Sequence, residues 1–165
     1  MNIQYATISF AQSYCEAVDA VAKERRFLGS TEGFPLESTF AFIQSVIENN
    51  QAQYFVIEQN QVIGWCDIIP KSYEGLRHVG ILGMGILPAY RGKGLGKLLL
   101  QKTIEHARTI NHLEKVELDV FESNKAAIAL YTKMGFTVEG RRQNSRKLDG
   151  VYDTILLMGN FLVTR

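Results

Sequence analysis

The sequence predicts a single α/β or α+β domain over residues 1–165, in which helices cover the faces of a β-sheet. Its length of 165 residues is typical of one compact domain. Hydrophobic residues make up 46% and charged residues 21%, as in ordinary folded proteins and unlike disordered chains. Segments with strand-like alternation and segments with helical apolar spacing follow one another without a repeat or a linker.

The first half of the chain is predicted to contain a strand, two helices and a hairpin. The expected elements are a strand over 2–9, helices over 11–27 and from about 37 to 50, and hairpin strands over 54–58 and 62–69. The helices have apolar residues three and four positions apart, whereas the strands alternate or form short apolar runs. Polar residues 59–61 form the turn, and Pro70 ends the second hairpin strand because it lacks an N–H donor.

The second half is predicted to contain four strands and two helices. The expected elements are a strand over 76–87, a helix over 95–111, a strand over 115–121, a helix over 126–134, and strands over 136–145 and 151–162. Pro88 ends the first of these strands, Ser123–Asn124 cap the shorter helix, and Gly135 stops it. Asp149–Gly150 is a strong signal for a hairpin between the last two strands.

The charge balance and the cysteines exclude several classes of protein. The chain has 18 Lys and Arg against 17 Asp and Glu, a net charge of +1, which gives no strong field for nucleic acid or an anionic membrane. Because no secretory pattern or long apolar run is present, we expect a cytoplasmic protein without a membrane span. Cys15 and Cys66 have no metal-binding spacing with His78, His106 or His112, so we expect reduced thiols and no metal.

A glycine-rich turn lies between a predicted strand and a predicted helix. Such a turn is an anion site, because free backbone N–H groups converge there with the positive end of the helix dipole. Gly92, Gly94 and Gly96 carry no side chains that would block a phosphate, and Arg91 and Lys93 add positive charge. The residues expected to bind the phosphates of a cofactor are Arg91, Gly92, Lys93, Gly94, Leu95, Gly96 and Lys97.

The spacing in this turn does not match two common phosphate-binding motifs. The dinucleotide-binding motif G-x-G-x-x-G requires its third glycine at Lys97, one residue after Gly96. The P-loop requires a glycine where this chain has Arg91, and a Ser or Thr where it has Leu98. From these residues alone, a glycine turn that opens a helix and binds nothing remains the alternative.

Two sequence motifs together indicate one family. Residues 84–96, M-G-I-L-P-A-Y-R-G-K-G-L-G, resemble the acetyl-CoA motif of the Gcn5-related N-acetyltransferase superfamily. Residues 118–136, L-D-V-F-E-S-N-K-A-A-I-A-L-Y-T-K-M-G-F, resemble the strand and helix that follow that motif, with its Tyr-x-x-x-Gly-Phe ending. The two motifs cover about 79–136 and have the order and separation of this superfamily.

The resemblance implies a mixed, mostly antiparallel seven-stranded sheet flanked by four helices, with two central strands that splay apart. It implies that the pantetheine arm of acetyl-CoA lies between those strands and pairs like an added strand. Backbone amides around Met84, Gly85 and Ile86 would bond this arm and polarise the thioester carbonyl. Gly83 and Gly85 suit a bulge or a close backbone approach, although a strand that simply packs against its neighbour is the alternative.

Acetyl transfer to an amine requires one group to take a proton and another to give one. An alkylamine of pKa about 10.4 is only about 0.1% neutral at pH 7, so a base must remove its proton. The departing thiolate, with a thiol pKa of about 8.5, benefits from a donor such as tyrosine. The resemblance assigns this role to Tyr131. Asn124 lies roughly 10 Å before it on one helix face and is implied to bind the cofactor; the alternatives are a core aromatic and a helix cap.

The base is open between several candidates. Asp119 occupies a position that is acidic in the ribosomal-protein alanine acetyltransferases, where that residue suits base work, but Asp is one methylene shorter than Glu. Glu32 and Glu37, beside the helical segment that forms the acceptor wall in this family, are alternatives, as is a water chain. A solvated surface carboxylate is the competing interpretation for each of the three residues.

The sequence therefore predicts an acetyl-CoA-dependent N-acetyltransferase that acts on a primary amine by direct attack on the thioester. The amine is a small molecule, an amino acid, or a peptide or protein N-terminus. A CoA-binding sensor or adaptor without turnover is the alternative, although Tyr131 and Asn124 argue against it. Residues 141–147 are basic, but the absence of interleaved aromatics favours a solvated hairpin over an RNA-binding one. The sequence does not distinguish a monomer from a homodimer.

Overall fold

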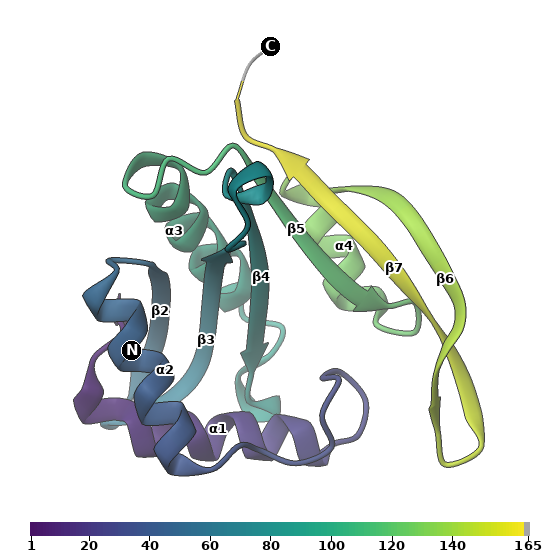
Figure 1. Cartoon of the computed structure of the whole chain (residues 1–165). Coiled ribbons are helices and arrows are strands. Elements are labelled where there is room, and N and C mark those ends of the chain that lie inside the picture. The colour runs from purple at the N-terminus through teal and green to yellow at the C-terminus, as the bar shows by residue number, and fades with distance from the viewer. Residues whose placement is uncertain (164–165) are drawn as a thin grey trace.

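The structure, a computed structural model, describes residues 1–163 (Figure 1). Its helices are α1 (Ala11–Lys23), α2 (Leu36–Glu48), α3 (Leu95–Thr109) and α4 (Lys125–Lys133). Its strands are β1 (Asn2–Tyr5), β2 (Ala52–Glu58), β3 (Gln61–Pro70), β4 (Val79–Ile86), β5 (Lys115–Phe121), β6 (Thr137–Leu148) and β7 (Val151–Phe161). The last two residues of the predicted domain lie outside the described part.

The strands form one seven-stranded sheet in the order β1-β2-β3-β4-β5-β7-β6. Neighbouring strands are antiparallel except β4 and β5, which are parallel. Helices α1 and α2 cover one face of the sheet, and α3 and α4 cover the other (Figure 1). We call these the α1/α2 face and the α3/α4 face. The predicted mixed, mostly antiparallel sheet with helices on its faces is confirmed.

Each face of the sheet has its own hydrophobic core, because side chains along a strand point alternately to opposite faces. In β3, Cys66 and Ile68 belong to the core on the α3/α4 face. Trp65, the residue before Cys66, belongs to the core on the α1/α2 face. Leu99 and Leu100 lie on the sheet-facing side of α3 and are fully buried, which anchors this helix on the sheet.

The two central strands separate after a short paired stretch. β4 and β5 pair only from Val79 to Ile81 on one strand and from Lys115 to Glu117 on the other. The rest of β4 remains paired with β3, whereas β5 continues along β7, so the two ribbons diverge (Figure 1). The predicted splay is confirmed, and it leaves the β5-facing edge of β4 beyond Ile81 without a strand partner among residues 1–163.

Two element boundaries in the first half differ from the sequence prediction. The strand predicted over 2–9 ends at Tyr5, because the following segment turns into a short 3₁₀ helix. The helix predicted over 11–27 ends at Lys23, since Arg25 adopts a left-handed conformation with φ of 59° that a helix cannot continue through. Apolar spacing alone did not reveal either backbone turn.

In the second half, the strand predicted from residue 76 begins at Val79, because a 3₁₀ turn precedes it. The predicted hairpin turn is confirmed: Asp149 and Gly150 have φ of 52° and 77°, as a type I′ turn requires. The strand predicted to end at residue 145 extends to Leu148, where it still pairs with β7. Within the described residues, no helix is long and apolar enough to cross a membrane.

Candidate active site

The glycine turn places unoccupied amides at the start of α3. Gly92 and Gly94 have φ of 75° and 79°, a left-handed conformation that favours glycine. A Cβ at either position would meet no heavy atom within 4 Å, so both face open space. Gly94 is the N-cap of α3 and offers no side chain to its first amides, which lack partners within the helix. The turn has the form of an anion cradle.

Gly96 and Leu95 are buried, unlike residues 92–94 of the same turn. Gly96 is buried, and a Cβ there would lie 3.0 Å from Cδ2 of Leu130 in α4 and 3.6 Å from Cδ1 of Ile86. The absence of a side chain at Gly96 therefore allows α3 to approach α4, and does not open space for a phosphate. Leu95 is also buried in the core, so only the backbone amides of these two residues can face an anion.

Arg91, predicted to add charge for the cofactor phosphates, is paired within the protein. Its guanidinium nitrogens donate to both carboxylate oxygens of Glu24, at 2.9 and 2.6 Å. Its Nε donates to the Ile86 carbonyl at 2.9 Å, and the guanidinium lies 4.7 Å from the Phe27 ring centroid. A bidentate pair of this kind fixes the side chain. The exposed charges at the turn are those of Lys93 and Lys97.

The unpaired edge of β4 presents the amides of Met84 and Ile86. The Leu87 N–H donates to the Ile63 carbonyl of β3 at 2.9 Å. Because the hydrogen-bonding groups of a strand alternate in direction, those of Ile86 and Met84 face away from β3, into the opening toward β5. The predicted thioester and pantetheine amides are therefore available in this geometry.

The glycines of β4 make room for side chains of β3 and do not form a bulge. The β3–β4 register is continuous from Gly64 opposite Ile86 to Pro70 opposite Gly80. A Cβ at Gly85 would lie 2.3 Å from Cη2 of Trp65, so Gly85 is required for that ring to pack. The predicted alternative, a strand packed against its neighbour, therefore describes Gly85.

Tyr131 and Asn124 lie on α4, on the α3/α4 face. Asn124 Oδ1 accepts a hydrogen bond from the Ala127 N–H at 3.2 Å, so this residue caps α4. Tyr131 is buried, with its ring centroid 5.7 Å from that of Phe136. Burial raises the pKa of Tyr131, and the nearby Cys66 thiol raises it further. The hydroxyl therefore stays protonated at neutral pH, as a proton donor must.

The three predicted base candidates are exposed. Asp119 extends from β5 on the α1/α2 face, with 61% of its side chain exposed and Oδ2 3.9 Å from a guanidinium nitrogen of Arg142. Glu37 lies in the first turn of α2, and Glu32 lies in the loop before that helix; both are exposed. The structure gathers none of these carboxylates into a protected position.

Asp67 is a half-buried acid that the sequence reasoning missed. It lies in β3 opposite Gly83, and its Oδ1 is 3.4 Å from the point where a Cβ at Gly83 would stand. Burial raises its pKa from 3.8 to about 7, partly offset by the amide of Gln53. Among residues 1–163 it has no ion-pair partner. One signal was available: an acid inside the apolar run from Val62 to Ile69 is costly to bury.

A sequence profile of the acetyltransferase (GNAT) family matches residues 17–136, most of the chain. The chain belongs to this family. A crystal structure of an acetyltransferase of the GNAT family from Streptococcus pneumoniae superposes with a TM-score of 0.90 at 27% identity, covering 97% of this chain and 98% of that chain. The resemblance and the fold predicted from the sequence are confirmed.

Two relatives whose names give different acceptors are similar in sequence to this chain. A spermidine N(1)-acetyltransferase from Vibrio cholerae is 29% identical over 114 residues, which cover 68% of this chain and 65% of that protein, just under two thirds. A ribosomal protein bS18 alanine N-acetyltransferase from Haemophilus influenzae is 33% identical over 123 residues, which cover 70% of this chain and 79% of that protein. Similarity to these two GNAT proteins does not select one acceptor.

The basic segment 141–147 of this GNAT chain is engaged within the fold. Arg141 pairs with Glu122 at 2.6 Å. The Arg146 guanidinium lies 4.2 Å from the ring centroid of Phe121 and donates to the Arg25 carbonyl at 2.9 Å. These contacts tie the β6–β7 hairpin to β5 and to the segment after α1.

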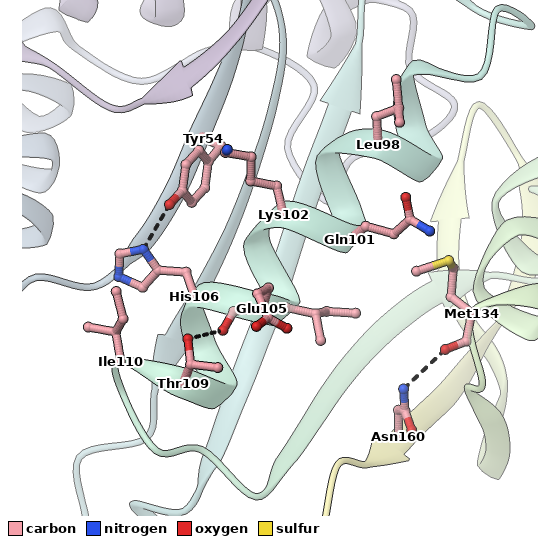
Figure 2. Close-up of a pocket in the computed structure, with 11 residues that line it drawn as sticks. Tyr54, Leu98, Gln101, Lys102, Glu105, His106, Thr109, Ile110, Met134 and Asn160 are labelled. Atoms are coloured by element: carbon pink, nitrogen blue, oxygen red, sulfur yellow. Dashed lines mark hydrogen bonds between the residues drawn. The ribbon is translucent and has the colours of Figure 1, made fainter.

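A groove of about 680 Å³ lies along the outer side of α3 of this GNAT chain (Figure 2). His106 lies in it, with Nδ1 3.0 Å from the Tyr54 hydroxyl and Nε2 2.9 Å from the Asn50 carbonyl. At the far side, Asn160 donates to the Met134 carbonyl at 3.2 Å. No residue from 91 to 97 lines this groove. Within residues 1–163, no cluster of His, Cys, Asp and Glu could hold a metal ion.

Proposed function

We propose that this chain is an acetyl-CoA-dependent N-acetyltransferase that acetylates a primary amine by direct attack on the thioester. One observation carries the proposal: the glycine turn joins the end of β4, with its unpaired edge, to the uncapped start of α3, and a buried tyrosine stands on the adjoining helix. A strand edge binds an extended arm, a helix start binds phosphates, and a protonated phenol serves a leaving thiolate.

The residues that would hold acetyl-CoA form a continuous path. The amides from Gly92 to Lys97 and the charges of Lys93 and Lys97 suit the pyrophosphate. The amides of Met84 and Ile86 suit the pantetheine arm and the thioester carbonyl. Asn124 accepts through its oxygen only, so its side-chain N–H groups can donate to the same arm. No metal is needed for this arrangement.

Tyr131 would donate its proton to the sulfur as the carbon–sulfur bond breaks. Its raised pKa keeps the proton on the phenol until the thiolate forms. The acceptor is proposed only as a class, namely a small-molecule amine, an amino acid or a peptide N-terminus. The spermidine and alanine specificities of the two relatives both fall within that class.

The test is an acetylation assay with spermidine, an alanine-starting peptide and free amino acids. Thiol release from acetyl-CoA and the mass gain of one acetyl group on the amine are followed together. We expect both signals with at least one amine. Acetyl-CoA binding without thiol release for any amine would replace this proposal with the sensor or adaptor function.

A further inference from the structure

We infer that Asp67 is the proton acceptor for the attacking amine, and that the acceptor binds on the α1/α2 face beside Gly83. The inference rests on the proposed function and assigns the base that the acetyl transfer requires. It differs from the sequence-based candidates, because Asp67 comes from β3 and not from β5 or the α2 region. It is carried by the position of the carboxylate relative to the open edge of β4.

Asp67 and Tyr131 lie on opposite faces of the sheet. Trp65 packs on the α1/α2 face, and Asp67, two residues further along β3, points to the same face. Cys66 points to the other face, where it shares a core with Tyr131. A thioester lying in the splay between β4 and β5 would therefore have a proton donor on one side and a proton acceptor on the other.

Asp67 also lies beside the part of β4 that would hold the thioester. It is opposite Gly83 in the register, one residue from Met84, whose amide faces the splay. The carboxylate Oδ1 stands only 3.4 Å from the missing Cβ of Gly83. Any larger residue at Gly83 would intervene between the carboxylate and the edge of β4. The glycine thus leaves the space that an amine needs to contact both the acid and the carbonyl carbon.

Among the described residues, no cation pairs with Asp67. Tyr14 of α1 faces it and is itself buried, with a pKa raised by burial and then by Asp67. Gln53 of β2, opposite Asp67 in the register, is fully buried, and neither polar atom of its side chain completes a hydrogen bond of good geometry. Cys66, the neighbour in sequence, has a raised pKa and stays a neutral thiol. An ammonium group is the partner that this site lacks.

Asp119 offers a poorer site for the same task. Its side chain is 61% exposed and lies near Arg142, a cation that competes with the substrate ammonium. Asp67 has no such competitor and titrates near pH 7, which matches the requirement for a base at neutral pH. Asp67 is therefore the better candidate for the base, because it is half-buried and pairs with no cation among the described residues.

The proton balance of the reaction is complete with these two residues. The ammonium gives one proton to the Asp67 carboxylate, and the neutral amine nitrogen attacks the thioester carbonyl carbon. The carbon–sulfur bond then breaks, and Tyr131 protonates the departing thiolate. As the amide forms, the nitrogen gives its second proton to the Tyr131 tyrosinate, which restores the phenol. Asp67 finally releases its proton to water, so the products are the amide, CoA thiol and one proton.

The first test compares Asp67→Asn and Asp67→Glu with wild-type enzyme, using spermidine or the alanine-starting peptide, whichever is acetylated faster. We expect Asp67→Asn to lower kcat/KM by about a hundredfold or more at pH 7, with acetyl-CoA affinity unchanged. Asp67→Glu should retain more activity than Asp67→Asn. Glu105→Gln, on the outer side of α3, is a matched control and should leave kcat/KM unchanged.

The second test separates a base from a structural residue. Trifluoroethylamine is largely neutral at pH 7, so its acetylation should be impaired far less by Asp67→Asn. With the alkylamine, wild-type kcat/KM should rise to a plateau with a midpoint near pH 7, whereas that of Asp67→Asn should keep rising as free amine accumulates. Equal losses for both amines, or a loss in Asp119→Asn but not in Asp67→Asn, would overturn the inference. A wild-type enzyme that releases no thiol would instead overturn the proposed function itself.

Discussion

The two faces of the sheet contribute to the site in different ways. On the α3/α4 face, the groups proposed to bind acetyl-CoA are backbone amides of β4 and α3, exposed by glycines and by an unpaired strand edge. On the α1/α2 face, the groups that could meet an acceptor are side chains from separate strands, such as Asp67 and Asp119. The first face is specified by local sequence, and the second by long-range packing.

This difference explains why the family is evident from the sequence and the acceptor is not. A backbone cradle needs glycines at fixed spacing, which leaves a motif in a short segment. An acceptor site assembled from β3, β4 and β5 leaves no such motif, because each strand contributes one residue. The predictions below test whether the two faces can be disturbed independently.

The largest expected effect belongs to Tyr131→Phe. Removing the hydroxyl deprives the thiolate of its proton donor while leaving the buried ring in place, so we expect kcat to fall by about a hundredfold. Acetyl-CoA affinity, measured by calorimetry, should change little. Tyr152→Phe, on the exposed hairpin, is the control. Parallel losses of turnover and affinity would mean that Tyr131 is structural.

Asp67→Asn should change how the free energy of unfolding depends on pH. The folded-state pKa of Asp67 lies near 7, above its ordinary value of 3.8, so the stability it gives below pH 4 is lost as pH rises toward 7. The side chain in the Asp67→Asn variant does not titrate, so the variant does not lose stability in this pH range. Its free energy of unfolding should exceed that of wild type by about 2 kcal/mol at pH 8, a value reduced for partial solvent access. Urea unfolding at pH 5 and pH 8 would show a gain that grows with pH; a constant difference would contradict a buried titrating acid.

Gly94→Ala should weaken acetyl-CoA binding and leave the acceptor side of the site unchanged. Gly94 has φ of 79° and Gly150 has φ of 77°, and neither has atoms within 4 Å of a built Cβ. Both alanine variants should therefore lose a similar stability, about 1 kcal/mol. Only Gly94→Ala should also lower acetyl-CoA affinity, by about tenfold, because it alters the anion cradle. If Gly150→Ala lost as much acetyl-CoA affinity, the loss would be due to backbone strain and not to a change in the anion cradle.

The smallest effect is expected for the Arg91–Glu24 pair. Both side chains are partly buried, with 33% and 23% exposed. We expect Glu24→Gln and Arg91→Gln each to cost about 1 kcal/mol of stability. Because they break one interaction, the double variant should cost less than their sum. Strict additivity in thermal unfolding would show that the two residues act independently.

The sequence predicted most helices and strands and the family correctly, because both rest on local signals. Apolar spacing marked the helices, and Asp149–Gly150 marked the last turn. The pairing of Arg91 with Glu24 could not be predicted, because Glu24 lies 67 residues earlier in the sequence and local spacing does not show which distant residues meet. Asp67 was missed for the same reason, since its position beside Gly83 depends on strand register.

The fold also explains why the glycines of β4 were interpreted incompletely. Glycines in a strand suggested a bulge or a close approach of the cofactor backbone. The deciding neighbours, Trp65 beneath Gly85 and Asp67 beneath Gly83, come from the preceding strand. A sequence pattern identifies that space is needed, but not which side chain fills it.

Arg91 joins three segments that are distant in the chain. Its guanidinium holds Glu24 just after α1 and the carbonyl of Ile86 at the end of β4, while its own backbone opens the glycine turn. Phe27, which follows Glu24, packs on the core of the α1/α2 face. Arg91 therefore links the segment after α1, strand β4 and the phosphate cradle. In the proposed site, the first of these lies above a bound acceptor and the second beneath it. In the proposed reaction, Arg91 thereby couples the position of the acceptor region to that of the cofactor.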